Sequence, residues 1–149
     1  MRNLLAFDLG ASNGRAILGQ FDGEKLTMRE LHRFENNYIE MNGVFYWDLP
    51  YLYNQLKQGL LAFKNANVGE LDCIGIDTWG VDFGLLGEDG TLLGDPVHYR
   101  DGRTAGMVEQ ALRTMDARTL YGATGNQIMA INTLFQLLAV KEQAPEVWR

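Results

Sequence analysis

The chain has 149 residues, 46% of them hydrophobic, and carries 13 Lys and Arg against 19 Asp and Glu, a net charge of −6. This composition suits one globular domain with a real core and argues against a basic surface for nucleic acid or anionic membranes. Any bound phosphate must therefore contact backbone amides and single basic residues. The single cysteine, Cys73, is expected to be buried, in a reducing compartment. We find no signal-peptide core and no membrane-spanning run, and expect a soluble, cytoplasmic protein.

Three antiparallel strands are predicted at the N-terminus. Residues 3–9 form an apolar strand, residues 10–14 are a turn of small and polar residues, and residues 15–21 form a second strand. So short a turn favours a hairpin. Residues 26–34 alternate between apolar and polar side chains well enough to predict a third strand.

A helix and a fourth strand follow. Asp48 is the predicted N-cap of a helix that has Pro50 in its first turn and ends near Ala66. The apolar residues that recur there at helical spacing are Leu49, Leu52, Leu56, Leu60 and Phe63. Residues 71–76 predict a fourth, buried strand. A connection from strand to helix to strand favours a parallel crossover.

Beyond this strand the sequence predicts a hairpin and a helix. Residues 81–86 and 91–93 flank the turn signal Glu88-Asp89-Gly90. Thr104 is then expected to cap a helix over residues 105–114.

Two further helices complete the prediction. Asp116 is expected to start a short helix that runs through Tyr121. The pattern Thr133-x-x-Gln136 fits a capping box at the start of a last helix, which runs towards Pro145.

These elements describe a layered α/β unit whose mixed sheet is opened by three antiparallel strands. We find no internal repeat and no low-complexity linker. The set of elements is incomplete for such a unit when the chain ends at Arg149. We therefore expect further strands and helices in a full-length protein.

The first candidate site is the turn of residues 10–14 with its flanks. Its two glycines let the backbone turn tightly, so that consecutive N–H groups can point at an anion. Ser12 and Asn13 add side-chain donors, and Arg15 adds positive charge. Asp8, at the strand end, can hold Mg²⁺ through water. The run is neither a P-loop nor a G-x-G-x-x-G motif. The alternative is a polar hairpin turn in which Asp8 caps its own backbone, and the pattern alone slightly favours it.

The second candidate site follows the fourth strand. Trp79 and Gly80 suit one wall of a sugar site, because an indole covers sugar C–H groups and a glycine admits a ligand to the backbone. Asp77 and Asp82 can accept hydrogen bonds from hydroxyls. The alternatives are core packing for the tryptophan and solvated strand ends for the two aspartates. Two such clusters at strand ends of one sheet favour a ligand site more than either does alone.

A third cluster is Tyr99-Arg100-Asp101-Gly102-Arg103-Thr104. Asp101 is expected to pair with Arg100 or Arg103, either as a structural pair or as part of a ligand site. His98 has no Cys or His near it, so we predict no metal site there. The amide-rich loop 124–127 has the composition of any loop.

Three runs, in this order, resemble the N-terminal part of the FGGY carbohydrate kinases: DLGASNGR, IGIDTWGVDFGLL and DPVHYRDGRT. Within that family, GIDTWGVDF followed by PVHYRD is similar to the members that act on L-rhamnulose. Glycerol and xylulose kinases carry other residues at the Trp79-Gly80 position. The runs HRFENN and NGVFYWDL fit as well, so the resemblance covers essentially the whole chain.

The resemblance implies a ribonuclease-H-like α/β fold of the actin/Hsp70/sugar-kinase superfamily, with two domains and a cleft that binds ATP and Mg²⁺. Residues 1–149 would be the N-terminal part of the first domain. The rest of that domain and the nucleotide-holding second domain would lie outside the chain. The implied partners are a small sugar and ATP, without nucleic acid or membrane.

Site residues follow from the same resemblance. The phosphate loop that it implies consists of Ala11, Ser12, Asn13, Gly14 and Arg15. Asp8 would lie near the metal, and the sugar would touch Gly80 with Trp79 beside it. The γ-phosphoryl of ATP would pass to the 1-hydroxyl of L-rhamnulose, a step of L-rhamnose catabolism. The family's catalytic base is an aspartate expected beyond Arg149, so we assign no catalytic residue here and expect the chain alone to be inactive.

Three alternatives stay open from the sequence. One is another FGGY ketose kinase, for fuculose or xylulose. Another is a non-catalytic nucleotide-binding module, which has no need of the residues 79–82 or of the cluster 99–103. The last is a structural domain that has lost its kinase chemistry.

Overall fold

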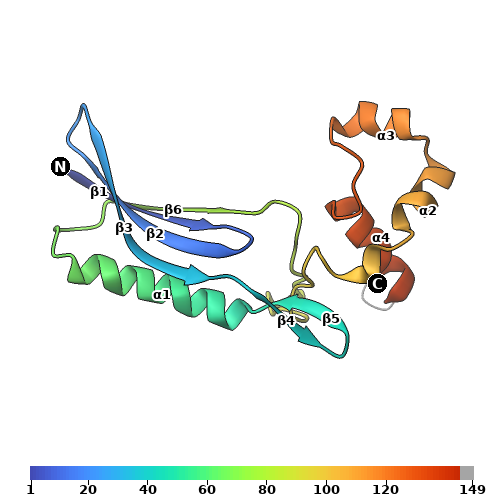
Figure 1. The fold of residues 1–149 in the computed structure, drawn as a ribbon, viewed down its shortest axis with the longest axis horizontal. Coiled ribbons are helices and arrows are strands. Elements are labelled where there is room, and N and C mark those ends of the chain that lie inside the picture. Colours follow the sequence, from blue (N-terminus) through green and yellow to red (C-terminus); the bar gives the residue numbers. More distant parts are fainter. Residues whose placement is uncertain (145–149) are drawn as a thin grey trace. The chain divides into compact units, whose positions relative to one another are not determined.

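The computed structural model describes residues 1–144, and Figure 1 shows their secondary structure. The chain divides into two compact units. The first consists of Met1–Ile39 and Asp48–Gly80, and the second of Glu40–Trp47 and the residues from Val81 on. The strands are β1 (Arg2–Leu9), β2 (Asn13–Phe21), β3 (Leu26–Glu35), β4 (Tyr38–Met41), β5 (Val44–Trp47) and β6 (Cys73–Thr78). The helices are α1 (Leu49–Asn65), the 3₁₀ helix η1 (Gly102–Thr104), α2 (Met107–Thr114), α3 (Ala117–Thr124) and α4 (Thr133–Gln143).

The first unit is built on a four-stranded sheet with the order β3-β2-β1-β6. The strands β1, β2 and β3 pair antiparallel in sequence, while β6 returns to pair parallel with β1. This confirms the three antiparallel strands and the parallel crossover predicted from the sequence.

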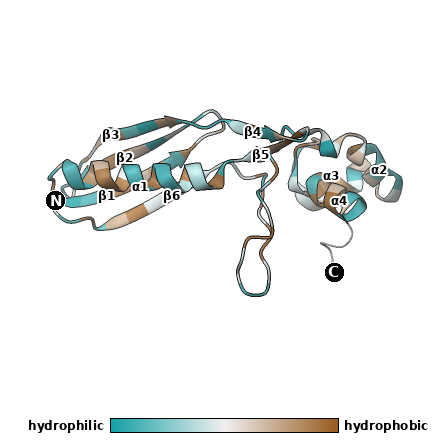
Figure 2. Ribbon diagram, turned by 90° about the horizontal axis from the view of Figure 1, so that it is seen from below, coloured by the Kyte–Doolittle hydropathy of each residue, from teal (hydrophilic) through white to brown (hydrophobic). Residues whose placement is uncertain are grey.

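Helix α1 covers one face of this sheet. Asp48 caps it, with its Oδ1 accepting a hydrogen bond from Tyr51 N (2.9 Å), and Pro50 lies in its first turn, as predicted. The helix contacts β1, β2 and β3. The buried side chains that form the core between sheet and helix are Leu5, Phe7, Ala16, Leu18 and Phe63. Figure 2 shows apolar and hydrophilic residues alternating along α1, as expected for a helix with one buried side.

Strand β6 differs from its prediction, because it is exposed rather than buried. Ile74 and Ile76 are 47% and 59% exposed, and Cys73 is exposed as well. The reason is position: within residues 1–144, β6 is an edge strand that pairs only with β1, and α1 packs over the other three strands. A short apolar run predicts a strand but does not say how many neighbours cover it.

In the second unit, β4 and β5 form a two-stranded sheet, and the chain at residues 96–98 runs alongside β5. Trp47 N donates to Pro96 O (2.9 Å), and His98 N donates to Phe45 O (2.8 Å). The turn predicted at residues 88–90 is present, but its flanks are held by one bridge rather than by two regular strands.

One helix of this unit starts at the predicted cap, and two start differently from the prediction. Asp116 caps α3 as predicted, accepting from Thr119 N (3.0 Å). The prediction for α2 is wrong at its start, because η1 intervenes and Gly106, with φ of 77°, precedes the helix. The predicted capping box is also wrong, since Asn132 precedes α4 and the side chains of Thr133 and Gln136 bond elsewhere. Pro145 lies outside the described residues.

Candidate functional site

The turn between β1 and β2 is held by its own main chain and by Asn36, the residue after β3. Gly10 N donates to Asn13 O (2.9 Å). Asn36, only 3% exposed, donates from Nδ2 to Gly10 O (2.7 Å) and from its main-chain N to Ser12 O (3.0 Å). Ser12 and Asn13 stay exposed. The turn thus presents a polar tip to solvent on a braced backbone, and Asn36 is a contributor that the sequence motif did not reveal.

The two glycines of this turn matter for space rather than for a left-handed backbone. Neither Gly10 nor Gly14 has a positive φ. A Cβ on Gly10 would lie 2.9 Å from Asn13 O, and one on Gly14 would lie 2.1 Å from the Phe34 ring. Any side chain at Gly14 would therefore displace Phe34 from the buried side of the sheet.

Asp8 and Arg15 form an ion pair across β1 and β2, in which Arg15 Nη2 donates to Asp8 Oδ2. Their side chains are 37% and 39% exposed, respectively. They lie on the sheet face opposite α1, because the residues next to them, Phe7 and Ala16, point into the core. Asp77, aligned with Asp8 in the parallel β1–β6 pairing, shares this end of the sheet. The structure therefore brings together two aspartates that the sequence had placed in separate candidate sites.

Metal ligands are few at this sheet end. Within residues 1–144, no three His, Cys, Asp or Glu side chains are grouped so as to hold a metal ion. A site made of Asp8, with Asp77 beside it, suits a cation that keeps several of its waters, as Mg²⁺ does.

The residues that follow β6 differ from each other in exposure. Trp79 is partly buried, whereas Gly80 is exposed. A Cβ placed on Gly80 would meet nothing within 4 Å. The backbone at Gly80 is therefore open to approach.

The carboxylate of Asp82, in contrast, accepts hydrogen bonds from three residues of the second unit. Its Oδ2 accepts from Trp47 Nε1 and from Tyr99 N (3.2 Å), and its Oδ1 accepts from Gln136 Nε2 (2.9 Å). Since three donors already converge on this carboxylate, its environment favours the structural alternative over binding of sugar hydroxyls.

Asp101 has a similar structural role. Its Oδ2 accepts from Phe45 N (2.9 Å) and its Oδ1 from Arg103 N (2.8 Å), which caps η1 and ties it to β5. The prediction that Asp101 pairs with the guanidinium of Arg100 or Arg103 is wrong, because backbone amides take both of its oxygens.

His98 is 1% exposed and lies between two aromatic rings. Its ring centroid is 4.1 Å from that of Trp47 and 4.5 Å from that of Tyr99, and its Nδ1 accepts from Arg100 N (3.0 Å). Burial lowers the pKa of His98, an effect that the nearby carboxylate of Asp82 opposes. The imidazole is thus neutral at pH 7 and acts as a packed acceptor rather than a charge.

Two polar side chains of α4 bind the chain just after Gly80. Thr133 Oγ1 donates to Val81 O (2.6 Å). Gln136, with none of its surface exposed, donates from Nε2 to Val81 O (3.1 Å) and to Asp82 Oδ1 (2.9 Å). The sequence analysis missed this role by assigning both residues to a capping box. The signal available was a Thr and a Gln three residues apart at the start of a helix whose other residues are apolar as far as Val140.

Arg103 joins this cluster from the other side. Its Nη2 donates to Gln136 Oε1 (2.6 Å), and its guanidinium carbon lies 5.7 Å from the centroid of the Phe83 ring. Burial lowers the pKa of Arg103 below its ordinary value, an effect that the nearby carboxylate of Asp101 opposes. Its Nε is buried and has no hydrogen-bond partner among the described residues.

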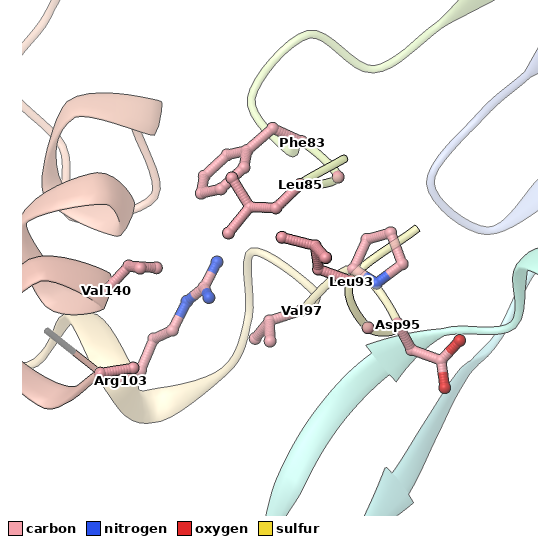
Figure 3. Close-up of a pocket in the computed structure, with 11 residues that line it drawn as sticks. Phe83, Leu85, Leu93, Asp95, Val97, Arg103 and Val140 are labelled. Atoms are coloured by element: carbon pink, nitrogen blue, oxygen red, sulfur yellow. The ribbon is translucent and has the colours of Figure 1, made fainter. Parts of the chain in front are cut away.

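A cavity of about 570 Å³ opens beside Arg103. In Figure 3, Phe83, Leu85 and Val140 surround the guanidinium, while the carboxylate of Asp95 points away from it. The residues that line the cavity are Phe83–Leu85, Leu93–Val97, Arg103, Val140 and Ala144. None of the residues predicted to bind phosphate, metal or sugar is among them.

Comparisons of the sequence and of the structure with known proteins all identify carbohydrate kinases. The profile of the FGGY family of carbohydrate kinases, N-terminal domain, matches residues 3–149. The chain belongs to this family. A rhamnulokinase of Halalkalibacterium halodurans is 43% identical over 149 residues, which are all of this chain and 32% of that protein. The FGGY chain described here therefore spans about a third of the length of this curated relative.

Solved structures of FGGY kinases share the fold. A ligand-bound xylulose kinase from Lactobacillus acidophilus matches with a TM-score of 0.82 and 17% identity, over 99% of this chain and 30% of that one. A glycerol kinase from Plasmodium falciparum with ADP matches with a TM-score of 0.70 and 18% identity, again over 99% and 30%. The expected fold, that of the actin/Hsp70/sugar-kinase superfamily, is confirmed. No helix within residues 1–144 is long and apolar enough to cross a membrane.

Proposed function

We propose that the complete protein carrying this FGGY chain transfers the γ-phosphoryl group of ATP to the 1-hydroxyl of L-rhamnulose. The observation that carries the proposal is the 43% identity to a rhamnulokinase along all 149 residues. The solved kinases for xylulose and glycerol, at 17% and 18%, share the fold with much less of the sequence.

The braced turn after β1 suits the phosphates of ATP. We assign phosphate binding to Ala11, Ser12, Asn13, Gly14 and Arg15. Ser12 and Asn13 are exposed donors, and Arg15 lies on the next strand with more than a third of its side chain open. The family and the ADP-bound glycerol kinase support ATP as the phosphoryl donor.

Asp8 is the residue we assign to Mg²⁺. Its carboxylate is accessible at the sheet end and is aligned with Asp77, so the donor set fits a cation that retains water ligands. Bound magnesium would neutralise charge on the β- and γ-phosphates. Arg15 pairs with Asp8 through Nη2 and is partly exposed, so its other N–H groups can donate to the phosphates.

The sugar is assigned to Gly80 and Trp79. The open backbone at Gly80 lets a hydroxyl group approach a main-chain amide or carbonyl directly. The indole of Trp79, two residues beyond Asp77, supplies an apolar surface for sugar C–H groups. Both residues follow the strand that ends next to Asp8, so donor and acceptor sites belong to one end of the sheet.

We further propose that residues 1–149 are the N-terminal part of the first kinase domain. The catalytic base and the main adenosine contacts would then belong to the other two thirds of a protein as long as the rhamnulokinase relative. Phosphoryl transfer needs the acceptor hydroxyl and the γ-phosphate held in line, so the 149-residue chain alone should have no appreciable activity.

The test is a coupled ADP-release assay on the complete protein with a panel of L-rhamnulose, L-fuculose, D-xylulose and glycerol. We expect the highest kcat/KM with L-rhamnulose. A clear preference for fuculose or xylulose would replace the substrate assignment, and the absence of sugar-dependent ADP release would reject the kinase. The same assay on the 149-residue chain should give no turnover, and turnover there would contradict the proposed division of the protein.

A further inference from the structure

Thr133 and Gln136 of α4 converge on one short piece of main chain. The carbonyl of Val81 accepts hydrogen bonds from Thr133 Oγ1 (2.6 Å) and from Gln136 Nε2 (3.1 Å). The next side chain, Asp82, accepts from the same Nε2 (2.9 Å). The peptide group that joins Val81 to Asp82, one residue beyond Gly80, is therefore held by two side chains from a helix more than fifty positions along the chain.

The surroundings determine which way the Gln136 amide points. Its oxygen accepts from Arg103 Nη2 (2.6 Å), and its nitrogen faces the oxygens of Ile131, Val81 and Asp82. A guanidinium can only donate, and carbonyls and carboxylates can only accept. The opposite orientation would place the amide oxygen against three acceptors, so a neutral amide with this one orientation is required.

Packing alone does not account for these residues. Gln136 is fully buried in the apolar stretch of α4 that runs from Leu134 to Val140, where a leucine would fill space without an amide to satisfy. Burying an amide costs free energy unless it is hydrogen-bonded, and here every bond of its nitrogen to residues 81–82 restrains the same segment. The arrangement therefore orders a specific stretch of backbone.

We propose that Thr133 and Gln136 are positioning residues for the sugar. They hold Val81 and Asp82, and thereby keep the neighbouring backbone of Gly80 in the conformation that binds the acceptor. This inference rests on the proposed function, in which Gly80 contacts the sugar. It predicts that changes on α4 affect sugar binding without affecting the nucleotide, because the phosphate turn is braced separately by Asn36.

The central test is Thr133→Val in the complete protein, with Thr133→Ser as its rescue. Valine keeps the shape but removes the hydroxyl that donates to Val81 O. We expect KM for L-rhamnulose to rise about fivefold, the effect of one hydrogen bond, with KM for ATP unchanged. Serine should restore the wild-type value. Equal rises in both KM values, or no rise in either, would overturn the proposal.

A second pair of variants tests the amide. Gln136→Glu places a carboxylate oxygen against Val81 O and Asp82, and should raise KM for the sugar at least tenfold. Gln143→Glu is the matched control, since it makes the same chemical change on an exposed residue of the same helix, whose Nε2 donates to Arg103 O (3.1 Å) and not to Val81 or Asp82. If both variants change KM for the sugar equally, charge on α4 rather than the bond to Val81 is responsible, and the proposal fails.

A measurement without substrate separates this proposal from the proposed function. Tyr99 N donates to Asp82, so hydrogen exchange of peptides containing residues 81–84 and Tyr99 reports whether the segment is held. Thr133→Val should speed exchange there about fivefold and leave peptides of β2 unchanged. If exchange in Thr133→Val were the same as in the wild-type protein, Thr133 would not hold residues 81–84, and the proposal would be rejected. If the wild-type protein had no kinase activity, the proposed function would be rejected. The exchange measurement would still show whether Thr133 holds residues 81–84.

Discussion

Asp8 and Asp82 are both aspartates at or just beyond the end of a strand, yet their surroundings are opposite. Asp8 has one side-chain partner, Arg15, and its carboxylate is accessible at the sheet end. Asp82 accepts hydrogen bonds from Trp47, Tyr99 and Gln136. The comparison teaches that the capacity to bind a ligand depends on unused hydrogen-bonding groups, which residue type does not reveal. The carboxylate of Asp8 is accessible and can accept further hydrogen bonds. The carboxylate of Asp82 already accepts three, which hold together distant segments of the second unit.

The largest expected effect is on stability, from Asp82→Ala. The substitution removes one hydrogen bond each from Trp47 Nε1, Tyr99 N and Gln136 Nε2, and Gln136 keeps the carbonyls of Val81 and Ile131 as acceptors. We expect a loss of about 4 kcal/mol in the free energy of unfolding, measured by urea denaturation. Asp77→Ala, at an exposed strand end, is the control and should change stability by less than about 0.5 kcal/mol. If the two variants lost similar amounts of unfolding free energy, Asp82 would be no more important to the fold than an exposed aspartate.

Gly14→Ala should have the next largest effect. Its Cβ would lie 2.1 Å from the Phe34 ring, so the ring or the strand must move, at a cost of about 2 kcal/mol. Gly80→Ala meets nothing within 4 Å and should leave stability nearly unchanged while raising KM for the sugar. Thermal unfolding and steady-state kinetics of the two variants distinguish these outcomes. A stable Gly14→Ala protein would show that Phe34 adapts easily.

Arg15→Ala tests the accessible region around Asp8, with which Arg15 forms an ion pair. A half-exposed ion pair adds little to stability, so we expect a change below about 1 kcal/mol. In the complete protein, KM for ATP should rise about tenfold, the loss of one charged contact to phosphate, and KM for the sugar should change much less. Equal effects on the two substrates would argue against a phosphate role for Arg15.

The smallest predicted effect is a pH dependence from His98. Burial lowers the pKa of this imidazole in the folded state, whereas in the unfolded chain it titrates near its ordinary value of about 6.5. Below that pH the unfolded chain binds a proton that the folded one does not, so the stability contributed above pH 6.5 is lost as the pH falls. We expect the free energy of unfolding to fall between pH 7.5 and 5.5 through this group. His98→Gln should show a smaller fall over the same range, and an identical fall would exclude His98 as the source.

Local patterns predicted the first unit well. The apolar run of β1, the short turn before β2, the alternation in β3, the Asp48 cap and the leucine spacing of α1 are short-range signals. The structure has these elements close to the predicted bounds. The exposure of β6 could not be predicted in this way, because burial depends on which elements cover a strand.

The second unit shows where reading the sequence failed. Thr133 and Gln136 fit a local capping pattern, but their side chains bond to Val81 and Asp82, far away in the sequence. Asp101 was expected to meet an arginine and instead accepts from backbone amides of Phe45 and Arg103. These contacts are long-range or involve the main chain, so a pattern of residue types contains no direct signal for them.

The exposed strand β6 has a consequence for the 149-residue chain in solution. Within residues 1–144 its outer edge is unpaired, and Ile74 and Ile76 are largely open to water. Such an edge is a template for strand addition by a second molecule. The net charge of −6 makes molecules repel each other, and salt screens that repulsion. Self-association of the chain should therefore increase with ionic strength, and a lysine in place of Ile76 should oppose it.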